Sequence, residues 1–324
     1  MKPVVHGGDM RESQRRFPDT PQPWIDLSTG INPVPYPVSA LPADVWSRLP
    51  THRDEQALLV AAAARYRIRD AATIAAAPGT QALIQLLPRL LRKARVAILG
   101  PTYEEHEVCW KRQGHEVTVV STLEEAERAD IAVVVNPNNP TGRLLPSETL
   151  RALAASVSFL VVDEAFIDLL PLQASLAGDV PPRTIVLRSF GKTYGLAGLR
   201  LGFAIAESDL IDRIRDELGP WAVSGPALEI GRMALCDDRW LVATTARLAA
   251  DQQRLDGILE PAGFKIVGGT SLFRLAHHPE AQAMVAKLGR CGIHVRRFAK
   301  EPHWLRFGVP ADTETFARLA AALV

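Results

Sequence analysis

Short runs of Val, Ile and Leu alternate with segments of helical periodicity from about residue 70 to residue 205. Nearly every position in these runs is apolar, which predicts strands buried on both faces, as in a mostly parallel sheet covered by helices. A first strand is expected to end near Ala77, and a helix is expected over 80–93 with Thr80 as its N-cap. Further strands are predicted at 95–100, 115–120, 130–135, 159–164, 184–189 and 199–205.

The pattern changes after about residue 215. A long helical stretch over 226–259 is followed by short strand-like segments, a helix, two more strand-like segments and a terminal helix. This order predicts a smaller C-terminal α+β domain. Residues 18–50 are rich in proline and are expected to form an extended arm. The predicted fold is therefore α/β, with an N-terminal arm (1–30), a large domain (31–215) and a small domain (216–324).

The composition of the chain argues against several classes of function. The 324 residues carry 37 basic and 36 acidic side chains, a formal net charge of +1, which argues against a nucleic-acid or membrane-surface partner. The three cysteines are far apart and form no CxxC pair, so neither a disulfide framework nor a metal site is expected. No apolar run is long enough for a signal peptide or a membrane span. A cytoplasmic protein is expected.

Polar residues follow the predicted strands, at the sheet edge where ligands bind in open α/β folds. Taken singly, each has a plain structural explanation: a capped turn, a core aromatic ring, or a loop built from turn formers. A carboxylate directly after an apolar strand is different, because its burial is costly without a partner. The residues at this edge are Gly79, Thr80, Gln81, Tyr103, Asn139, Asp163, Ser189, Lys192 and Arg200.

The Gly191-Lys192-Thr193 triplet could suggest a nucleotide-binding loop. Such a loop needs a second glycine five residues before Gly191, and that position is Val186, within an apolar strand. Lys192 instead is suited to form a covalent bond through its amine. The residues at this edge also supply a carboxylate that can pair with a ring nitrogen and several groups that can bind a phosphate. Together these are the groups that pyridoxal 5'-phosphate (PLP) requires.

Three motifs carry a family resemblance: "SFGKTYGLAGLRLGF" (189–203), "NPNNPTG" (136–142) and "VVDEAF" (161–166). They resemble the signature blocks of fold-type I PLP enzymes, the aminotransferase class I/II superfamily, whose members form homodimers. The resemblance implies that Lys192 forms a Schiff base with PLP and moves protons, and that Asp163 pairs with the pyridine nitrogen. It also implies that Tyr103 stacks on the ring and Asn139 bonds its phenolic oxygen. The implied phosphate ligands are Gly79, Thr80, Gln81, Ser189 and Arg200.

The opening "VVHGGD" and "WIDLSTGINPVPYP" resemble the threonine-phosphate decarboxylase branch more than the histidinol-phosphate aminotransferase branch. The first branch implies decarboxylation of a phosphorylated amino acid in cobalamin biosynthesis. The core motifs alone fit either reaction, and a non-catalytic ligand-binding protein is the alternative of another class. Implied substrate residues are Arg306 for a carboxylate, Arg296 for a phosphate, and His6 and Asn32 from the arm.

Two positions depart from the family pattern. Phe166 stands where many relatives have a tyrosine that bonds the cofactor's ring oxygen. Leu49 stands where many have a tyrosine that reaches the neighbouring subunit's cofactor phosphate. The first departure predicts altered cofactor electronics, and the second puts that inter-subunit contact in doubt.

Overall fold

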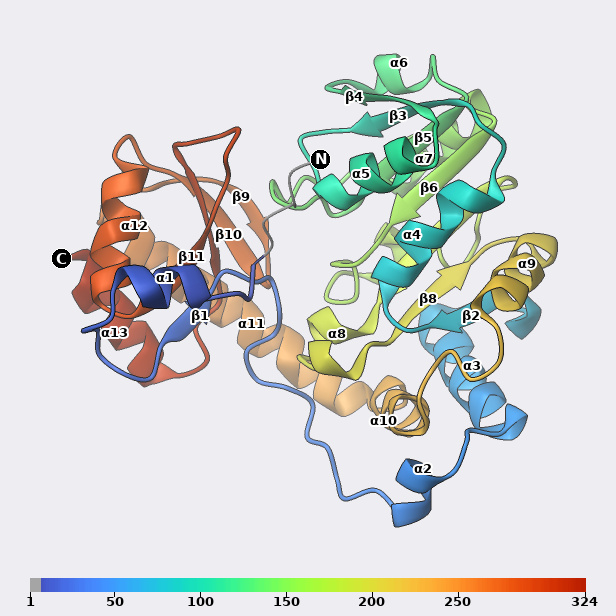
Figure 1. The fold of residues 1–324 in the computed structure, drawn as a ribbon, viewed down its shortest axis with the longest axis horizontal. Coiled ribbons are helices and arrows are strands. Elements are labelled where there is room, and N and C mark those ends of the chain that lie inside the picture. Colours follow the sequence, from blue (N-terminus) through green and yellow to red (C-terminus); the bar gives the residue numbers. More distant parts are fainter. Residues whose placement is uncertain (1–6) are drawn as a thin grey trace. The chain divides into compact units, whose positions relative to one another are not determined.

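The computed structural model describes residues 7–324, which form two compact units (Figure 1). The first unit contains the N-terminal segment up to Val34, the short stretch Pro140–Gly142, and Val242–Val324. The second contains Pro35–Asn139 and Arg143–Leu241. The helices are α1 (Arg11–Arg16), α2 (Ala43–Ser47), α3 (His52–Tyr66), α4 (Thr80–Leu90), α5 (Glu104–Arg112), α6 (Leu123–Ala126), α7 (Ser147–Ser156), α8 (Phe190–Thr193), α9 (Ser208–Leu218), α10 (Gly225–Leu235), α11 (Asp238–Leu259), α12 (Ala281–Arg290) and α13 (Thr313–Leu323).

A seven-stranded sheet in the order β2-β8-β7-β6-β5-β3-β4 organises the second unit. All its neighbouring strands are parallel except for β8, which is antiparallel to both β2 and β7. The predicted strands and the mostly parallel sheet are therefore confirmed. The strands are β2 (Ile74–Ala77), β3 (Arg95–Leu99), β4 (Glu116–Val120), β5 (Ile131–Val135), β6 (Phe159–Asp163), β7 (Thr184–Ser189) and β8 (Gly202–Ile205).

The two faces of this sheet are buried in separate cores, which explains the continuous apolar runs. Side chains alternate between the faces of a strand, so Val134 and Val162 join one core while Val133 and Val161 join the other. The first core also contains residues of α3, α7 and α10. The second contains residues of α4, α5 and α9, and α4 and α5 are seen over this face of the sheet in Figure 1.

The N-cap of the helix after β2 lies one residue earlier in the chain than predicted. Thr80 is the first residue of α4, and Gly79, with φ +86°, is its N-cap. The Thr80 N-cap prediction is therefore wrong. The turn out of β2 needs positive φ at the capping position, which glycine adopts without the steric penalty that threonine would meet.

The first unit contains a five-stranded sheet in the order β1-β11-β12-β10-β9. The N-terminal segment supplies its edge strand, which pairs in parallel with β11. The extended arm expected over 18–50 is largely extended, with β1 within it, and its one α-helix, α2, is short and has no buried residue. The strands are β1 (Ile25–Leu27), β9 (Lys265–Thr270), β10 (Phe273–His277), β11 (Ile293–Arg297) and β12 (Trp304–Gly308).

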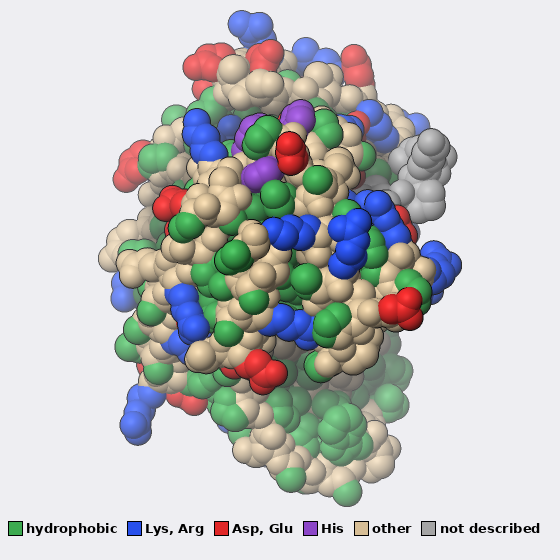
Figure 2. Space-filling view, turned by 90° about the vertical axis from the view of Figure 1, so that its left-hand side faces the viewer, with side chains coloured by type: hydrophobic (Ala, Val, Ile, Leu, Met, Phe, Trp, Pro, Cys, Tyr) green, Lys and Arg blue, Asp and Glu red, His purple; other side chains and the backbone are tan. Residues whose placement is uncertain are grey.

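The surface shows no dominant charge. On the face in Figure 2, basic and acidic side chains are interspersed with apolar and polar ones, in keeping with the formal net charge of +1. Within residues 7–324, no helix combines the length and the apolar character needed to span a bilayer.

Candidate active site

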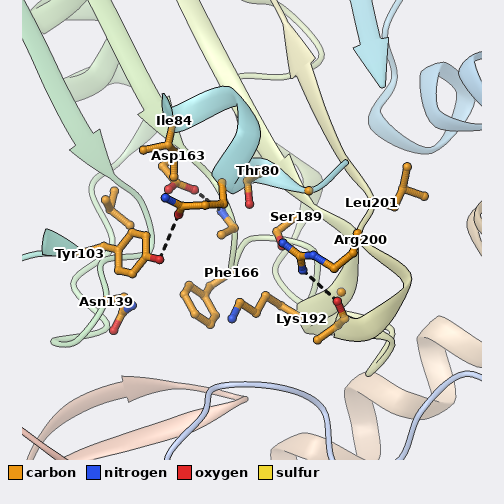
Figure 3. Close-up of a pocket in the computed structure, with 16 residues that line it drawn as sticks. Thr80, Ile84, Tyr103, Asn139, Asp163, Phe166, Ser189, Lys192, Arg200 and Leu201 are labelled. Atoms are coloured by element: carbon orange, nitrogen blue, oxygen red, sulfur yellow. Dashed lines mark hydrogen bonds between the residues drawn. The ribbon is translucent and has the colours of Figure 1, made fainter. Parts of the chain in front are cut away.

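A cavity of about 160 Å³ lies at the carboxyl edge of the large sheet (Figure 3). Every residue expected to hold the cofactor lines it: Gly79, Thr80, Gln81, Tyr103, Asn139, Asp163, Ser189, Lys192 and Arg200. These residues follow β2, β3, β5, β6 and β7 in the chain, and all five strands run in the same direction. Their ends therefore meet at one edge, which brings together side chains that are far apart in the sequence.

One end of the cavity is built to receive an anion. The N-terminus of α4 presents backbone N–H groups there, and the Arg200 guanidinium lies beside it and donates to the Ala197 carbonyl at 2.9 Å. A Cβ atom on Gly79 would lie 2.7 Å from Arg200 Nη2. Glycine is therefore required for arginine and helix terminus to approach this closely. Helix amides, a guanidinium and the Ser189 hydroxyl form a donor set that fits a phosphate dianion.

The carboxylate of Asp163 is fixed from two sides. Asp163 is the last residue of β6 and is 3% exposed. Its Oδ1 accepts from the Ala165 N–H at 3.1 Å, and its Oδ2 lies 3.0 Å from His106 Nε2. His106 is also buried and was not predicted from the sequence. Its position in α5, three residues after Tyr103, was the available signal.

The Tyr103 ring is anchored through its hydroxyl. The hydroxyl donates to Gln81 Oε1 at 3.1 Å (Figure 3). Gln81 Nε2 in turn donates to Glu105 Oε2 at 2.9 Å. Gln81 thus contacts Tyr103 directly. The pair fixes the ring at the cavity wall, where its face can cover a planar ligand.

Lys192 enters the cavity from α8, the single helical turn that follows β7. Its Nζ lies 5.8 Å from the centroid of the Phe166 ring, which also lines the cavity (Figure 3). The departure from tyrosine at this position thus places an apolar ring beside the amine.

The neighbouring Glu164 belongs to a separate buried network. It accepts from Arg188 Nη1 at 3.0 Å and from Ser175 Oγ at 2.5 Å, and Arg188 also pairs with Asp168. Burial raises the pKa of Glu164. Burial lowers the pKa of Arg188, but Asp168 and Glu164 more than offset this effect, so that its pKa is raised overall. The two adjacent carboxylates at the end of β6 thus have different surroundings: Asp163 lines the cavity, and Glu164, the residue after the strand, pairs with Arg188 of β7.

The remaining predicted residues belong to the first unit. Arg306 is 7% exposed and donates to the Ser28 carbonyl at 2.7 Å, and it pairs in register with Arg296 across β12 and β11. Burial and the nearby Arg296 lower the pKa of Arg306 to about 9. Asn32 is buried, and its Oδ1 accepts from Arg247 Nη2 at 2.6 Å. His6 lies outside the described residues.

Comparisons with known proteins agree with this architecture. The family model "Aminotransferase class I and II" matches residues 46–323. The threonine-phosphate decarboxylase of Pseudomonas aeruginosa is 42% identical over 99% of this chain and 97% of its own length, and that of Sinorhizobium sp is 44% identical over 99% and 98%.

A solved structure supports the same fold. The histidinol-phosphate aminotransferase of Sinorhizobium meliloti, determined in complex with pyridoxal-5'-phosphate, superposes with a TM-score of 0.80 at 24% identity. The superposition covers 99% of this chain and 94% of that one. The fold, the cavity and the matched family model lead to one conclusion: the chain belongs to the aminotransferase class I and II family and has the fold of the fold-type I PLP enzymes.

Proposed function

We propose that this chain decarboxylates L-threonine O-3-phosphate to (R)-1-amino-2-propanol O-2-phosphate, a step of cobalamin biosynthesis, with PLP as its cofactor. The observation that carries the proposal is near-full-length similarity, at 42% and 44% identity, to two threonine-phosphate decarboxylases. The composition of the cavity supports it, since the lining residues supply each group that PLP needs.

The cavity residues divide the work of holding the cofactor. Arg200, Ser189 and the N-terminus of α4 bind its phosphate. Asp163 carries the charge opposite the protonated ring nitrogen, and His106 keeps that carboxylate oriented. Asn139 donates to the ring oxygen, and the ring of Tyr103 covers one face. When bound, PLP supplies an electron-poor ring that accepts the electron pair released at the substrate Cα.

Lys192 has two tasks at its Nζ atom. It would attach the cofactor covalently, and it would return a proton to the substrate Cα. The side chains around it are apolar on one side because Phe166 replaces a hydroxyl-bearing residue. The amine is thus kept in a partly water-excluded setting, where it exchanges protons with the substrate in preference to solvent.

The substrate is bound through its two anionic groups. Arg306 and Arg296 face each other on adjacent strands, and like charges in that position destabilise a sheet. Bound anions relieve this repulsion, and phosphothreonine carries a carboxylate and a phosphate. Arg306 is assigned to the carboxylate and Arg296 to the phosphate, and Asn32 and His6 of the N-terminal arm are further substrate-binding residues of this proposal. By orienting the substrate Cα, these contacts would decide whether the carboxylate or the hydrogen leaves.

The deciding experiment supplies purified holoenzyme with phosphothreonine and measures carbon dioxide. Release of carbon dioxide with formation of the amino alcohol phosphate is expected. Transfer of the amino group to 2-oxoglutarate without carbon dioxide would instead identify an aminotransferase. Binding without either product would identify a non-catalytic protein.

The proposal includes a homodimer that acts in the cytoplasm without a nucleic-acid or membrane partner. Trp46, Leu49 and Trp221 are 68%, 64% and 59% exposed, and we take these large apolar side chains as candidates for the subunit interface. The cysteines are free thiols, as expected in a reducing compartment. Light scattering should give twice the mass of one chain, and cell fractionation should recover the protein with cytoplasmic enzymes.

A further inference from the structure

The Gly7-Gly8 pair has no role in the chemistry described so far, yet it is tightly docked. The Gly8 N–H donates to Ser28 Oγ at 2.7 Å, and Gly8 has φ +90°. A Cβ atom on Gly7 would lie 2.4 Å from the Ser28 carbonyl oxygen. Only glycine therefore allows the N-terminal segment to pack against the backbone of Ser28.

Ser28 is completely buried, directly after β1, and each of its polar groups makes a hydrogen bond. Its N–H and its hydroxyl both donate to Asp26 Oδ1, at 2.8 and 2.6 Å. The hydroxyl oxygen accepts from Gly8, and the carbonyl accepts from Arg306 Nη2 at 2.7 Å. One residue thus connects the N-terminal segment, β1 and the buried arginine of β12.

The bond to Arg306 sets the orientation of a charged group. A guanidinium is planar, so fixing Nη2 on a rigid carbonyl sets its plane and the directions of its other N–H groups. The carboxylate of Asp26 supplies a negative charge close enough to act on Arg306, opposing the effect of Arg296. The orientation of Arg306 therefore depends on Ser28 remaining in place.

We propose that Ser28, locked by Asp26 and by Gly7-Gly8, is a positioning residue that aims the Arg306 guanidinium at the substrate anion. This inference rests on the proposed function in assigning Arg306 to the substrate. It gives the His-Gly-Gly segment a structural purpose: its glycines close over Ser28 and hold the carbonyl that orients Arg306.

Two variants of the holoenzyme test the proposal. Ser28→Ala leaves the Gly8 N–H and one Asp26 contact unsatisfied, and Gly7→Ala forces the segment off the Ser28 carbonyl. Each should raise KM for phosphothreonine about tenfold, the effect of one lost buried hydrogen bond, while kcat changes less than about threefold. PLP affinity should not change. Matched controls are Ser224→Ala, which removes a helix-capping hydroxyl, and Gly257→Ala, whose added Cβ meets nothing within 4 Å.

A second readout separates this inference from the proposed function. Acetate, a carboxylate probe for Arg306, should raise the melting temperature of the wild-type holoenzyme and should do so less for Ser28→Ala. This holds even if phosphothreonine is not turned over, a result that would reject only the proposed function. The inference is overturned if acetate stabilises both proteins equally or neither. It is also overturned if Ser28→Ala loses stability as Ser224→Ala does while its KM stays at the wild-type value.

Discussion

The Nε2 atom of His106 lies 3.0 Å from Oδ2 of Asp163, and both side chains are almost completely buried. The histidine lies in α5 and the carboxylate ends β6, so the contact forms only when these elements pack together. The other carboxylate oxygen is held by the Ala165 N–H. Asp163 is thus oriented by the protein itself, which reduces the reorganisation needed when a ring cation binds.

Replacing His106 with Phe should weaken PLP binding about tenfold, because a buried carboxylate that loses a hydrogen-bond partner costs on the order of 1–3 kcal/mol. His106→Gln keeps a donor and should bind PLP more nearly as the wild type does. Titration of the apoenzymes with PLP, followed by absorbance, measures both. Equal affinity of the Phe variant and the wild type would show that His106 does not support Asp163.

Gly79→Ala should damage the phosphate end of the cavity. Its Cβ would meet Arg200 Nη2 at 2.7 Å, and its φ of +86° costs a non-glycine residue roughly 1–2 kcal/mol. PLP affinity should fall at least about tenfold, because the cost of the strained backbone adds to the loss of binding from the displaced Arg200. Gly198→Ala is the matched control, because a Cβ there meets nothing within 4 Å. Similar losses in the two variants would point to a general defect of this loop.

Phe166→Tyr should change the absorption spectrum of the bound cofactor with little effect on the fold. The added hydroxyl would be introduced near Lys192 and could donate to the cofactor's ring oxygen. A hydrogen bond to the ring oxygen favours the deprotonated form of the Schiff base between PLP and Lys192. The pH at which the cofactor spectrum changes from the protonated to the deprotonated form should therefore be lower in the variant. A spectrophotometric pH titration measures the midpoint. An unchanged midpoint would mean that the hydroxyl does not reach the cofactor.

Arg306→Gln should abolish substrate binding without destabilising the protein at pH 7. The folded-state pKa of Arg306, about 9, lies well below that of a free arginine, so holding its charge in the fold costs stability at neutral pH. A neutral glutamine avoids that cost. The melting temperature should equal or exceed that of the wild type, and the advantage should shrink as pH rises above about 9. A large loss of stability would contradict this account.

Lys192→Ala should abolish turnover while PLP remains bound without a covalent bond. The cavity contacts of the phosphate and ring do not depend on the amine, so binding should survive in weaker form. Borohydride treatment followed by peptide mass spectrometry should label Lys192 in the wild type and no residue in the variant. Labelling of another lysine in the wild type would contradict the assignment.

Much of the cavity could be predicted because its residues follow strands that the sequence marks clearly. Near-continuous apolar runs indicated β3, β5, β6 and β7, and parallel strands bring their carboxyl ends to one edge of the sheet. The first polar residues after such strands must therefore lie near one another. Asp163 and Lys192 were identified on this basis together with the family motifs.

Only the tertiary structure shows which side chains form hydrogen bonds with the predicted site residues. The local sequence around His106 and Ser28 does not show that they support Asp163 and Arg306, because each hydrogen bond joins residues far apart in the chain. The same is true of β1, whose pairing with β11 connects opposite ends of the sequence. Local periodicity determines which segments become strands and helices, whereas long-range contacts depend on how the assembled elements pack.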